Sequence, residues 1–186
     1  TIHKALFNKE GIARTKFLYS VKEKGQGGEY ISTIWEADYD GYNARQITKD
    51  AGYSISPVYV PPNKGSAPGS FCYVSYKTGQ SNMYIASLKD GIGQRLNDLR
   101  CNLLMPTITK TCDKIAFISD YTANPDLFLQ PFSKDAGVLE KPRQIFASKH
   151  GTQGSPRFNP DGSKIAFVSN KDGSPKVYVM KVPEPN

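Results

Sequence analysis

The alternation of apolar and polar positions near the C-terminus predicts a unit of three short strands. Two runs rich in Val, Ile, Phe and Tyr, at 165–168 and 177–182, are each preceded by a polar turn. The turns read Asn-Pro-Asp-Gly at 159–162 and Asn-Lys-Asp-Gly at 170–173. Proline and glycine supply the backbone angles that such turns require, and β-branched and aromatic residues favour strands. Residues 155–182 are therefore predicted to form a β-meander.

The same unit recurs with a period of about 50 residues, which indicates a repeat architecture. Met105–Ile108 matches Ser155–Phe158, and Lys114–Ser119 matches Lys164–Ser169. The unit opens once more at Ser56, again just before a proline. In every copy nine residues separate a serine at the end of the second strand from an aromatic residue in the third: Ser75 and Tyr84, Ser119 and Phe128, Ser169 and Tyr178. A period of 40 to 50 residues with several strands per unit is typical of propeller blades.

These repeats predict an all-β fold, a β-propeller of four-stranded antiparallel blades in which 1–186 forms about three and a half blades. Blade 1 covers 13–48 and lacks its inner strand; blade 2 covers 51–97, blade 3 covers 101–146, and a partial blade 4 covers 151–182. One spacing differs between the copies. Fourteen residues separate Pro57 from Phe71, but nine separate Pro106 from Ile115 and Pro156 from Ile165. An insertion of five residues within 61–70 is therefore predicted in the first turn of blade 2, where insertions are tolerated.

The charge of the chain narrows its function classes only slightly. The net charge is +7 and the pI is about 9.2, but the Lys and Arg residues are scattered. A mildly basic, solvated surface fits better than a nucleic-acid-binding stripe. The sequence has no apolar run near the ~18 residues that a membrane-spanning helix needs. It shows no signal peptide and begins at Thr1 rather than Met, so we expect a mature or excised piece.

The candidate metal ligands and thiols form no recognisable site. Three cysteines, Cys72, Cys101 and Cys112, are too few and too irregularly spaced for a disulfide framework. Cys72 lies within a predicted strand and is expected to act as a small buried apolar residue. Pairing of Cys101 with Cys112 in an oxidising compartment stays open as the less favoured alternative. His3 and His150 lie far apart, so no zinc site and no cofactor is expected.

Two further motifs have a structural and a functional interpretation. The glycine-rich stretch 25–28 weakly resembles a phosphate-binding loop, but no helix follows it, so a hairpin tip is favoured. The spaced carboxylates of 38–43 could suggest a calcium loop, but the remaining ligands of such a loop are missing, so a turn is favoured.

The repeat unit carries a family resemblance. Ser-Pro-x-Phe-x-Pro-Asp-Gly-Ser-Lys-Ile-Ala-Phe-x-Ser, followed by a Val-Tyr-Val strand, resembles the propeller repeat of the TolB family. The segment 37–43, after a strand that starts near Arg14, is similar to the first blade of that family, and the resemblance covers essentially the whole chain. It implies a six-bladed ring behind an N-terminal α/β domain, a periplasmic location, and a role in the Tol–Pal envelope system through binding of the lipoprotein Pal.

The chain departs from the family pattern in several places. The N-terminal domain, about two blades and the strand that closes the ring have no counterpart in its 186 residues. The segments 62–64 and 111–113 also replace the Asp-Gly turn in two repeats. Because an incomplete ring exposes sheet edges, which favour association, we expect either that the remainder is supplied elsewhere or that the chain pairs with a copy of itself.

A partner is expected at the segments that enter the inner strands, because these segments rim the mouth of the central channel. They are 51–56, 100–105 and 150–155, and they combine apolar, aromatic and polar side chains as protein-binding patches do. The alternative is that Ile55 and Met105 only fill the ring interior. The family resemblance places Pal on this rim. The candidate partner-binding residues are Tyr53, Ser54, Ile55, Asn102, Leu103, Leu104, Met105, His150, Thr152, Gln153 and Gly154.

Two enzyme classes with propellers are less favoured than a non-enzymatic binding scaffold. A peptidase of the prolyl-oligopeptidase kind, in which the propeller gates the active site, requires a Gly-x-Ser-x-Gly nucleophile motif. The sequence has none, and in 65–69 the serine stands at the wrong position. A propeller glycosidase requires paired carboxylates facing the channel. The predicted inner strands at 57–60, 106–109 and 156–159 carry no carboxylate.

Overall fold

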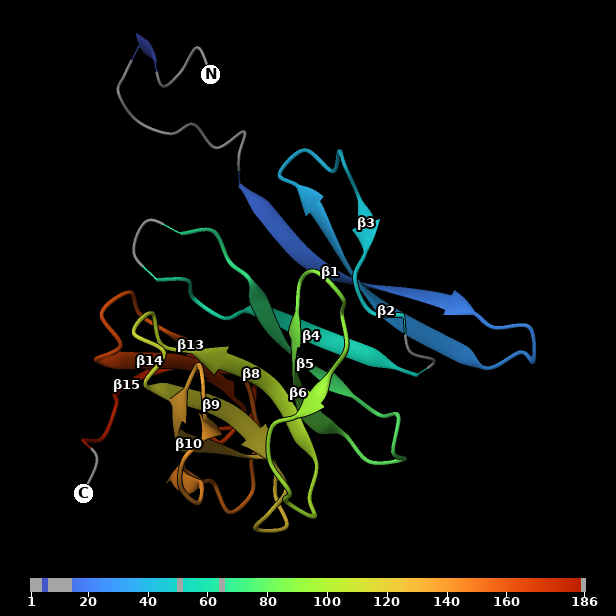
Figure 1. The fold of residues 1–186 in the computed structure, drawn as a ribbon. Helices are drawn as coiled ribbons and strands as arrows, with labels where there is room; N and C mark the ends of the chain where they lie inside the picture. Colours follow the sequence, from blue (N-terminus) through green and yellow to red (C-terminus); the bar gives the residue numbers. More distant parts are fainter. Residues whose placement is uncertain (1–4, 7–14, 50–51, 64–65, 185–186) are drawn as a thin grey trace.

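The computed structural model describes residues 5–6, 15–49, 52–63 and 66–184, and four antiparallel sheets account for its strands (Figure 1). Blade 1 is made of β1 (Lys16–Lys24), β2 (Tyr30–Asp38) and β3 (Arg45–Gln46). Blade 2 is made of β4 (Ser54–Tyr59), β5 (Ser70–Ser75), β6 (Asn82–Ser87) and β7 (Gln94–Arg95). Blade 3 is made of β8 (Leu103–Ile108), β9 (Lys114–Ser119), β10 (Asp126–Ser133), β11 (Gly137–Val138) and β12 (Arg143–Phe146). Blade 4 is made of β13 (Gln153–Phe158), β14 (Lys164–Ser169) and β15 (Lys176–Lys181).

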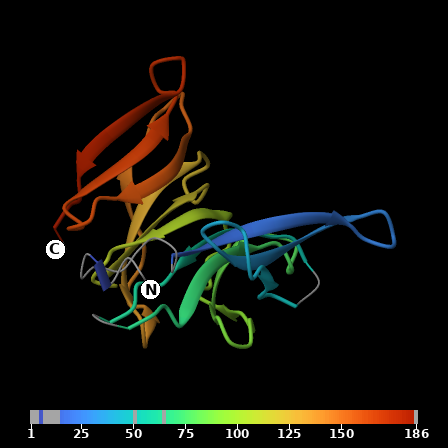
Figure 2. The ribbon, with the colours of Figure 1, turned by 90° about the horizontal axis from the view of Figure 1, so that it is seen from above.

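The sheets follow one another in chain order around an arc. Figure 2 shows them fanned from the blue strands of blade 1 to the red strands of blade 4. The first strands of neighbouring blades lie side by side, since β8 contacts both β4 and β13. Apart from the helical residues Ala5 and Leu6, the described residues contain only strands, bridges, turns and bends. The predicted all-β fold of antiparallel, propeller-type blades is confirmed.

Each pair of neighbouring blades encloses its own apolar core. Blades 1 and 2 share Ile34 and Phe71, blades 2 and 3 share Val74 and Phe117, and blades 3 and 4 bury Phe167 against residues of β9 and β10. Burial of such side chains on both faces of a sheet is the main force that holds blades together.

The aromatic residue of the third strand is part of these cores, and its invariant spacing follows from strand register. Three aromatic pairs lie directly opposite each other on the second and third strands of blades 2, 3 and 4. Their ring centroids are 5.6, 6.1 and 6.0 Å apart, and all three pairs are stacked. Cross-strand aromatic pairs stabilise a sheet and fix its register. The pairs are Tyr73 with Tyr84, Phe117 with Phe128, and Phe167 with Tyr178.

Two details differ from the sequence-based expectations. The sequence predicts strands at 14–21 and 31–38 joined by a loop at 22–29. In the structure β1 continues to Lys24 and β2 begins at Tyr30, so only 25–29 form the turn. In blade 3 the short strand β11 pairs with β10 beside the expected fourth strand β12. Residues 13–14 and 51, assigned to the starts of blades 1 and 2, lie outside the described residues, as do His3 and Lys64.

The two motifs with alternative interpretations both form turns. In the glycine-rich stretch, the N–H of Gly25 donates to the carbonyl of Glu29 at 2.7 Å, which closes a hairpin. In the acidic stretch, Asp38 accepts hydrogen bonds from Lys16 at 2.7 Å and from Asn43 at 2.6 Å. These bonds hold the pKa of Asp38 below its usual value. One Asp38 carboxylate oxygen is thus engaged by β1 and the other by the turn.

Candidate functional site

The face that the sequence predicted to rim a channel mouth, called the channel-mouth face below, is formed by the segments that enter β4, β8 and β13 and by the turns between the second and third strands of each blade. The three first strands begin earlier than the prolines suggested, because each pairs with the serine that ends the second strand. Ser54 lies opposite Ser75, Leu103 opposite Ser119, and Gln153 opposite Ser169. Much of each segment that was expected to be a connection is therefore strand.

A β-bulge in each first strand explains how pairing continues past the proline, which has no N–H to donate. The residue before each proline has a left-handed backbone, with φ of 53° at Ser56, 52° at Met105 and 49° at Ser155. The strand register shifts at the same three places. A bulge bends its strand and redirects side chains. The residue before each proline therefore has the same backbone conformation and the same position in its strand in all three blades.

The bulges of blades 3 and 4 touch each other. The backbone N–H of Ser155 donates to Sδ of Met105 at 3.1 Å. A Cβ built on Gly154 would meet the same sulfur at 3.7 Å, which is ordinary van der Waals contact. The Met105 side chain remains 38% exposed. It thus lies across the first strand of the next blade while one side stays open to solvent.

Asn102 links blades 2 and 3 on this face. Its backbone N–H donates to Oδ1 of Asp120 at 2.7 Å, and its Nδ2 donates to Oδ2 of the same carboxylate at 2.6 Å. Its own Oδ1 accepts a hydrogen bond from the hydroxyl of Ser81 at 3.0 Å. Hydrogen bonds to a charged group are stronger than neutral ones. These hydrogen bonds therefore fix the position of the segment that enters β8.

Blade 4 repeats part of this arrangement. The N–H of Thr152 donates to Oδ1 of Asn170 at 2.7 Å, and Asn170 stands in the place that Asp120 occupies in blade 3. The segment is packed tightly beside it, since a Cβ on Gly151 would lie 2.8 Å from the backbone of Lys171. The neighbouring His150 is exposed.

Three exposed tyrosines on this face were not among the candidates from sequence. Tyr76 lies 6.0 Å from Tyr53, edge to face, and Tyr121 is 61% exposed. Tyr30 is 59% exposed and carries Nζ of Lys22 3.9 Å above its ring. All three follow or precede turns between second and third strands. In a meander, the turns between second and third strands lie at the same end of the sheet as the segments that enter the first strands. The residues of these turns could therefore have been added to the candidates from the sequence alone.

The candidates from sequence differ greatly in exposure. Ser54, Leu103 and Gln153 are at most 6% exposed, because they pair within the sheet. Ile55 and Leu104 are partly buried against the core between blades 2 and 3. The side chains that offer surface are those that point away from the sheet or precede the strands: Tyr53, Asn102, Met105, His150 and Thr152, with Gly154 beside Met105.

The face has no arrangement that resembles a metal or redox site. Within the described residues no three His, Cys, Asp or Glu side chains are grouped so that they could hold a metal ion. No helix of the described part of the chain has the length and apolarity needed to cross a membrane. All three cysteines are free, and the segments before and after β8 carry Cys101 and Cys112 at its opposite ends. Burial raises the pKa of the Cys72 thiol to about 12, in keeping with its expected role as a buried apolar residue.

One protein-family profile matches nearly the whole chain. The profile of the TolB beta propeller domain matches residues 3–186. The chain belongs to the TolB β-propeller family. The TolB homolog of Protochlamydia amoebophila is 59% identical over 187 residues, which cover 100% of this chain and 40% of the relative. The chain thus spans about two fifths of the length of that curated relative.

Solved structures share the fold at low sequence identity. TolB from Acinetobacter baumannii has a TM-score of 0.73, 21% identity, and covers 97% of this chain and 42% of its own. A puromycin-hydrolyzing peptidase from Mycobacterium tuberculosis has a TM-score of 0.59 and 9% identity, over 88% of this chain and 28% of its own. At these identities the likeness concerns the fold alone. The peptidase likeness therefore says nothing about catalysis in this TolB-like chain.

Proposed function

We propose that this chain is part of a non-enzymatic protein-binding propeller of the Tol–Pal envelope system, located in the periplasm. Its partner in this proposal is the lipoprotein Pal, bound at the channel-mouth face. Membership of the TolB family supports the Tol–Pal role. The observation that carries the choice of face is the position of Met105, an apolar side chain that is 38% exposed and lies beside Gly154 of the next blade.

The mouth has the anatomy of a protein interface rather than of an active site. Met105 and Tyr53 supply apolar and aromatic surface, while Asn102 and Thr152 supply polar neighbours held by hydrogen bonds. Protein interfaces combine such a core with a polar rim, and preformed segments lower the cost of ordering on binding. The other candidate, a gating propeller of a prolyl-oligopeptidase-like peptidase, requires a hydrolase domain in the same reading frame.

The proposal is tested by calorimetric titration of Pal against the complete propeller. The variants Met105→Asp and Gly154→Arg place a charge at the mouth. Asp tolerates the left-handed backbone of position 105, and the space above Gly154 accepts a Cβ. Loss of a buried anchor costs ~2 kcal/mol or more, so each variant is expected to weaken binding by about thirtyfold.

The controls are Asp90→Ala and Asp161→Ala on the opposite face, where each carboxylate accepts a hydrogen bond within its own turn. These two variants are expected to bind Pal normally. If they lose binding while the mouth variants keep it, the choice of face is wrong. If folded variants of both sets bind like the parent protein, Pal is not the partner of this surface.

A further inference from the structure

A groove of about 720 Å³ lies between blades 1 and 2, at the end of the sheets opposite the channel mouth. Ligand sites commonly measure about 300 to 1,000 Å³, so the groove is large enough for a short peptide segment. Blade 1 contributes Glu36 and Arg45, and blade 2 contributes Tyr59, Pro68, Leu88 and Lys89.

The floor of the groove is a hydrogen-bonded group of three polar side chains. Glu36 is 4% exposed. Its Oε2 accepts hydrogen bonds from Nε and Nη2 of Arg45 at 3.0 and 2.8 Å, and its Oε1 accepts one from the hydroxyl of Tyr59 at 3.0 Å. Burial, reinforced by the charge of Glu36, raises the pKa of Tyr59, so its hydroxyl remains a donor. The buried carboxylate is thus fully paired, and the floor is rigid and close to neutral.

Two cationic groups at the groove still have the capacity to bind an anion. Arg45 has five N–H donors; two bind Glu36 and one donates to the carbonyl of Leu88 at 3.2 Å. The Arg45 side chain is 50% exposed, and its other two donors have no partner among the described residues. Lys89 likewise has no ion pair within that part of the chain, whereas Lys16 is paired with Asp38.

The apolar wall comes from the insertion that sets blade 2 apart from the other repeats. The inserted turn, within 61–70, places Ala67, Pro68 and Gly69 along the groove, and Leu88 lies beside them. The shorter first turns of blades 3 and 4 lack these residues. The feature that breaks the repeat in the sequence is therefore the one that builds this wall.

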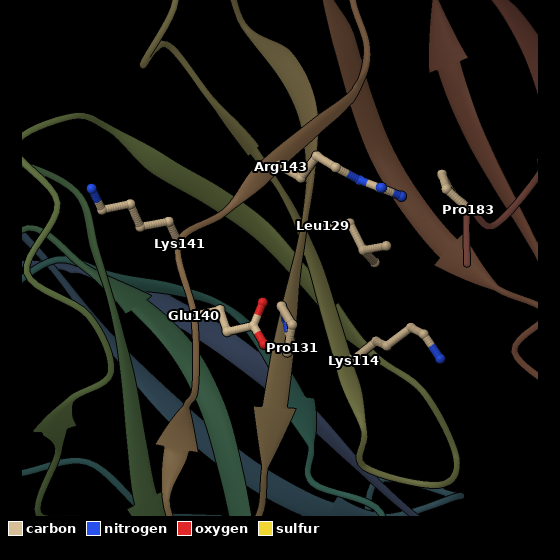
Figure 3. Close-up of a pocket in the computed structure, with 7 residues that line it drawn as sticks. All are labelled: Lys114, Leu129, Pro131, Glu140, Lys141, Arg143 and Pro183. Atoms are coloured by element: carbon tan, nitrogen blue, oxygen red, sulfur yellow. The ribbon is translucent and has the colours of Figure 1, made fainter. Parts of the chain in front are cut away.

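The corresponding position between blades 3 and 4 shows what the groove would be without these features. A smaller pocket of about 240 Å³ is found there, and Arg143, in a second Arg-Gln-Ile sequence, occupies the place of Arg45. In Figure 3 the Arg143 side chain extends toward Pro183, with Leu129 close by. Nη2 of Arg143 donates to the carbonyl of Glu184 at 3.2 Å. That pocket is thus smaller, and the guanidinium of its arginine already forms a hydrogen bond within the chain.

We propose that the groove between blades 1 and 2 binds an acidic peptide segment. A carboxylate of the peptide would contact Arg45 and Lys89, and an adjacent apolar side chain would pack on Pro68 and Leu88. Lys16 and Arg45 are each paired with one carboxylate, so Lys89 gives the groove an excess of positive charge that favours such an anion. The free N–H groups of the Arg45 guanidinium match carboxylate geometry. The site lies on the opposite face from the Pal site proposed above and does not depend on it.

The test is a titration of the full-length protein with acetyl-Leu-Asp-Leu-amide, followed by NMR shifts of labelled amides. The matched probe is acetyl-Leu-Asn-Leu-amide, which has the same shape without the charge. The Asp peptide is expected to bind at least fivefold more tightly, since one charge pair contributes about 1 kcal/mol. Lys89→Gln is expected to weaken it by about fivefold, while Lys181→Gln, on blade 4, leaves it unchanged. Arg45 itself is left intact, because its loss would strand Glu36 in a buried position.

Three results would overturn the proposal: equal affinity for the two peptides, no effect of Lys89→Gln, or binding of free acetate as tight as that of the peptide. The last result would indicate a site for small anions only. The mouth variant Met105→Asp separates this site from the proposed Pal site. It is expected to keep peptide binding even where it abolishes Pal binding, so failure of one proposal leaves the other testable.

Discussion

The carboxylate of Asp120 accepts two hydrogen bonds from Asn102, one from its backbone N–H at 2.7 Å and one from its side-chain amide at 2.6 Å. Because Asn102 also accepts a hydrogen bond from Ser81 of the preceding blade, the pair ties two blades together at the channel mouth. The start of the turn after β9 and the segment before β8 are thereby held in one geometry.

Asp120→Ala is expected to lower the free energy of unfolding by about 2 kcal/mol, because it leaves the partly buried donors of Asn102 without an acceptor. Urea denaturation measures the change. The matched control is Asp135→Ala, an exposed carboxylate with no hydrogen bond within the described residues, which is expected to change stability by less than about 0.5 kcal/mol. Equal effects of the two substitutions would show that the pair does not stabilise the fold.

Ser56→Gly is expected to stabilise the protein slightly. Ser56 has a φ of 53°, and a left-handed backbone costs a residue with a side chain about 1 to 2 kcal/mol. Glycine removes that cost but loses about 0.5 to 1 kcal/mol through greater freedom in the unfolded chain, so a net gain near 0.5 kcal/mol remains. Ser70→Gly, in the regular strand β5, is expected to destabilise by about 0.5 to 1 kcal/mol. Thermal unfolding of both variants should therefore show shifts of opposite sign.

Asp113→Asn is expected to destabilise the protein at neutral pH and to have little effect in acid. Burial alone would raise the pKa of Asp113, but hydrogen bonds from Lys114, Thr109 and Thr111 outweigh it and hold the pKa far below 3.8. A depressed pKa in the folded state gives stability that is present above the unfolded value and is lost as the pH falls through the folded one.

Urea midpoints of the parent protein and Asp113→Asn should therefore differ most at pH 6 to 7. The difference should begin to shrink below about pH 4 and vanish only as the pH approaches the depressed pKa of the folded state. The exposed carboxylate Asp135 again provides the control, as Asp135→Asn. A difference that does not shrink between about pH 5 and pH 2 would mean that the charge of Asp113 has no part in the effect.

The 186-residue chain on its own is expected to self-associate. On the outer side of blade 4, Val177 and Val179 of β15 are 72% and 65% exposed, next to a strand edge that pairs with no strand of the described chain. Exposed apolar edge strands promote association. Val177→Lys combined with Val179→Lys should shift sedimentation velocity profiles toward the monomer. A parent chain that sediments as a single monomeric species would contradict this expectation.

The local chemistry of the sequence determined the strands, the turns and their repeat. Asn159–Gly162 forms a turn because proline and glycine supply the angles, and the pairing of Phe167 with Tyr178 follows from the turn length between them. The repeat therefore led to the propeller-type fold and to the family. The five-residue insertion in blade 2 could also be read from spacing alone. Each of these features depends on residues close together in the chain.

Contacts between blades determined which side chains are buried, which are exposed and which are paired. Nothing local to Leu103 shows that it is fully buried while Met105, two residues later, is exposed, because the bulge before Pro106 changes the direction of the side chains. Glu36 and Arg45 are nine residues apart, yet the burial of Glu36 and the hydrogen bonding of both side chains depend on Tyr59 and Leu88 of the next blade. Exposure and pairing of this kind depend on which blade lies alongside, and only the tertiary structure determines that.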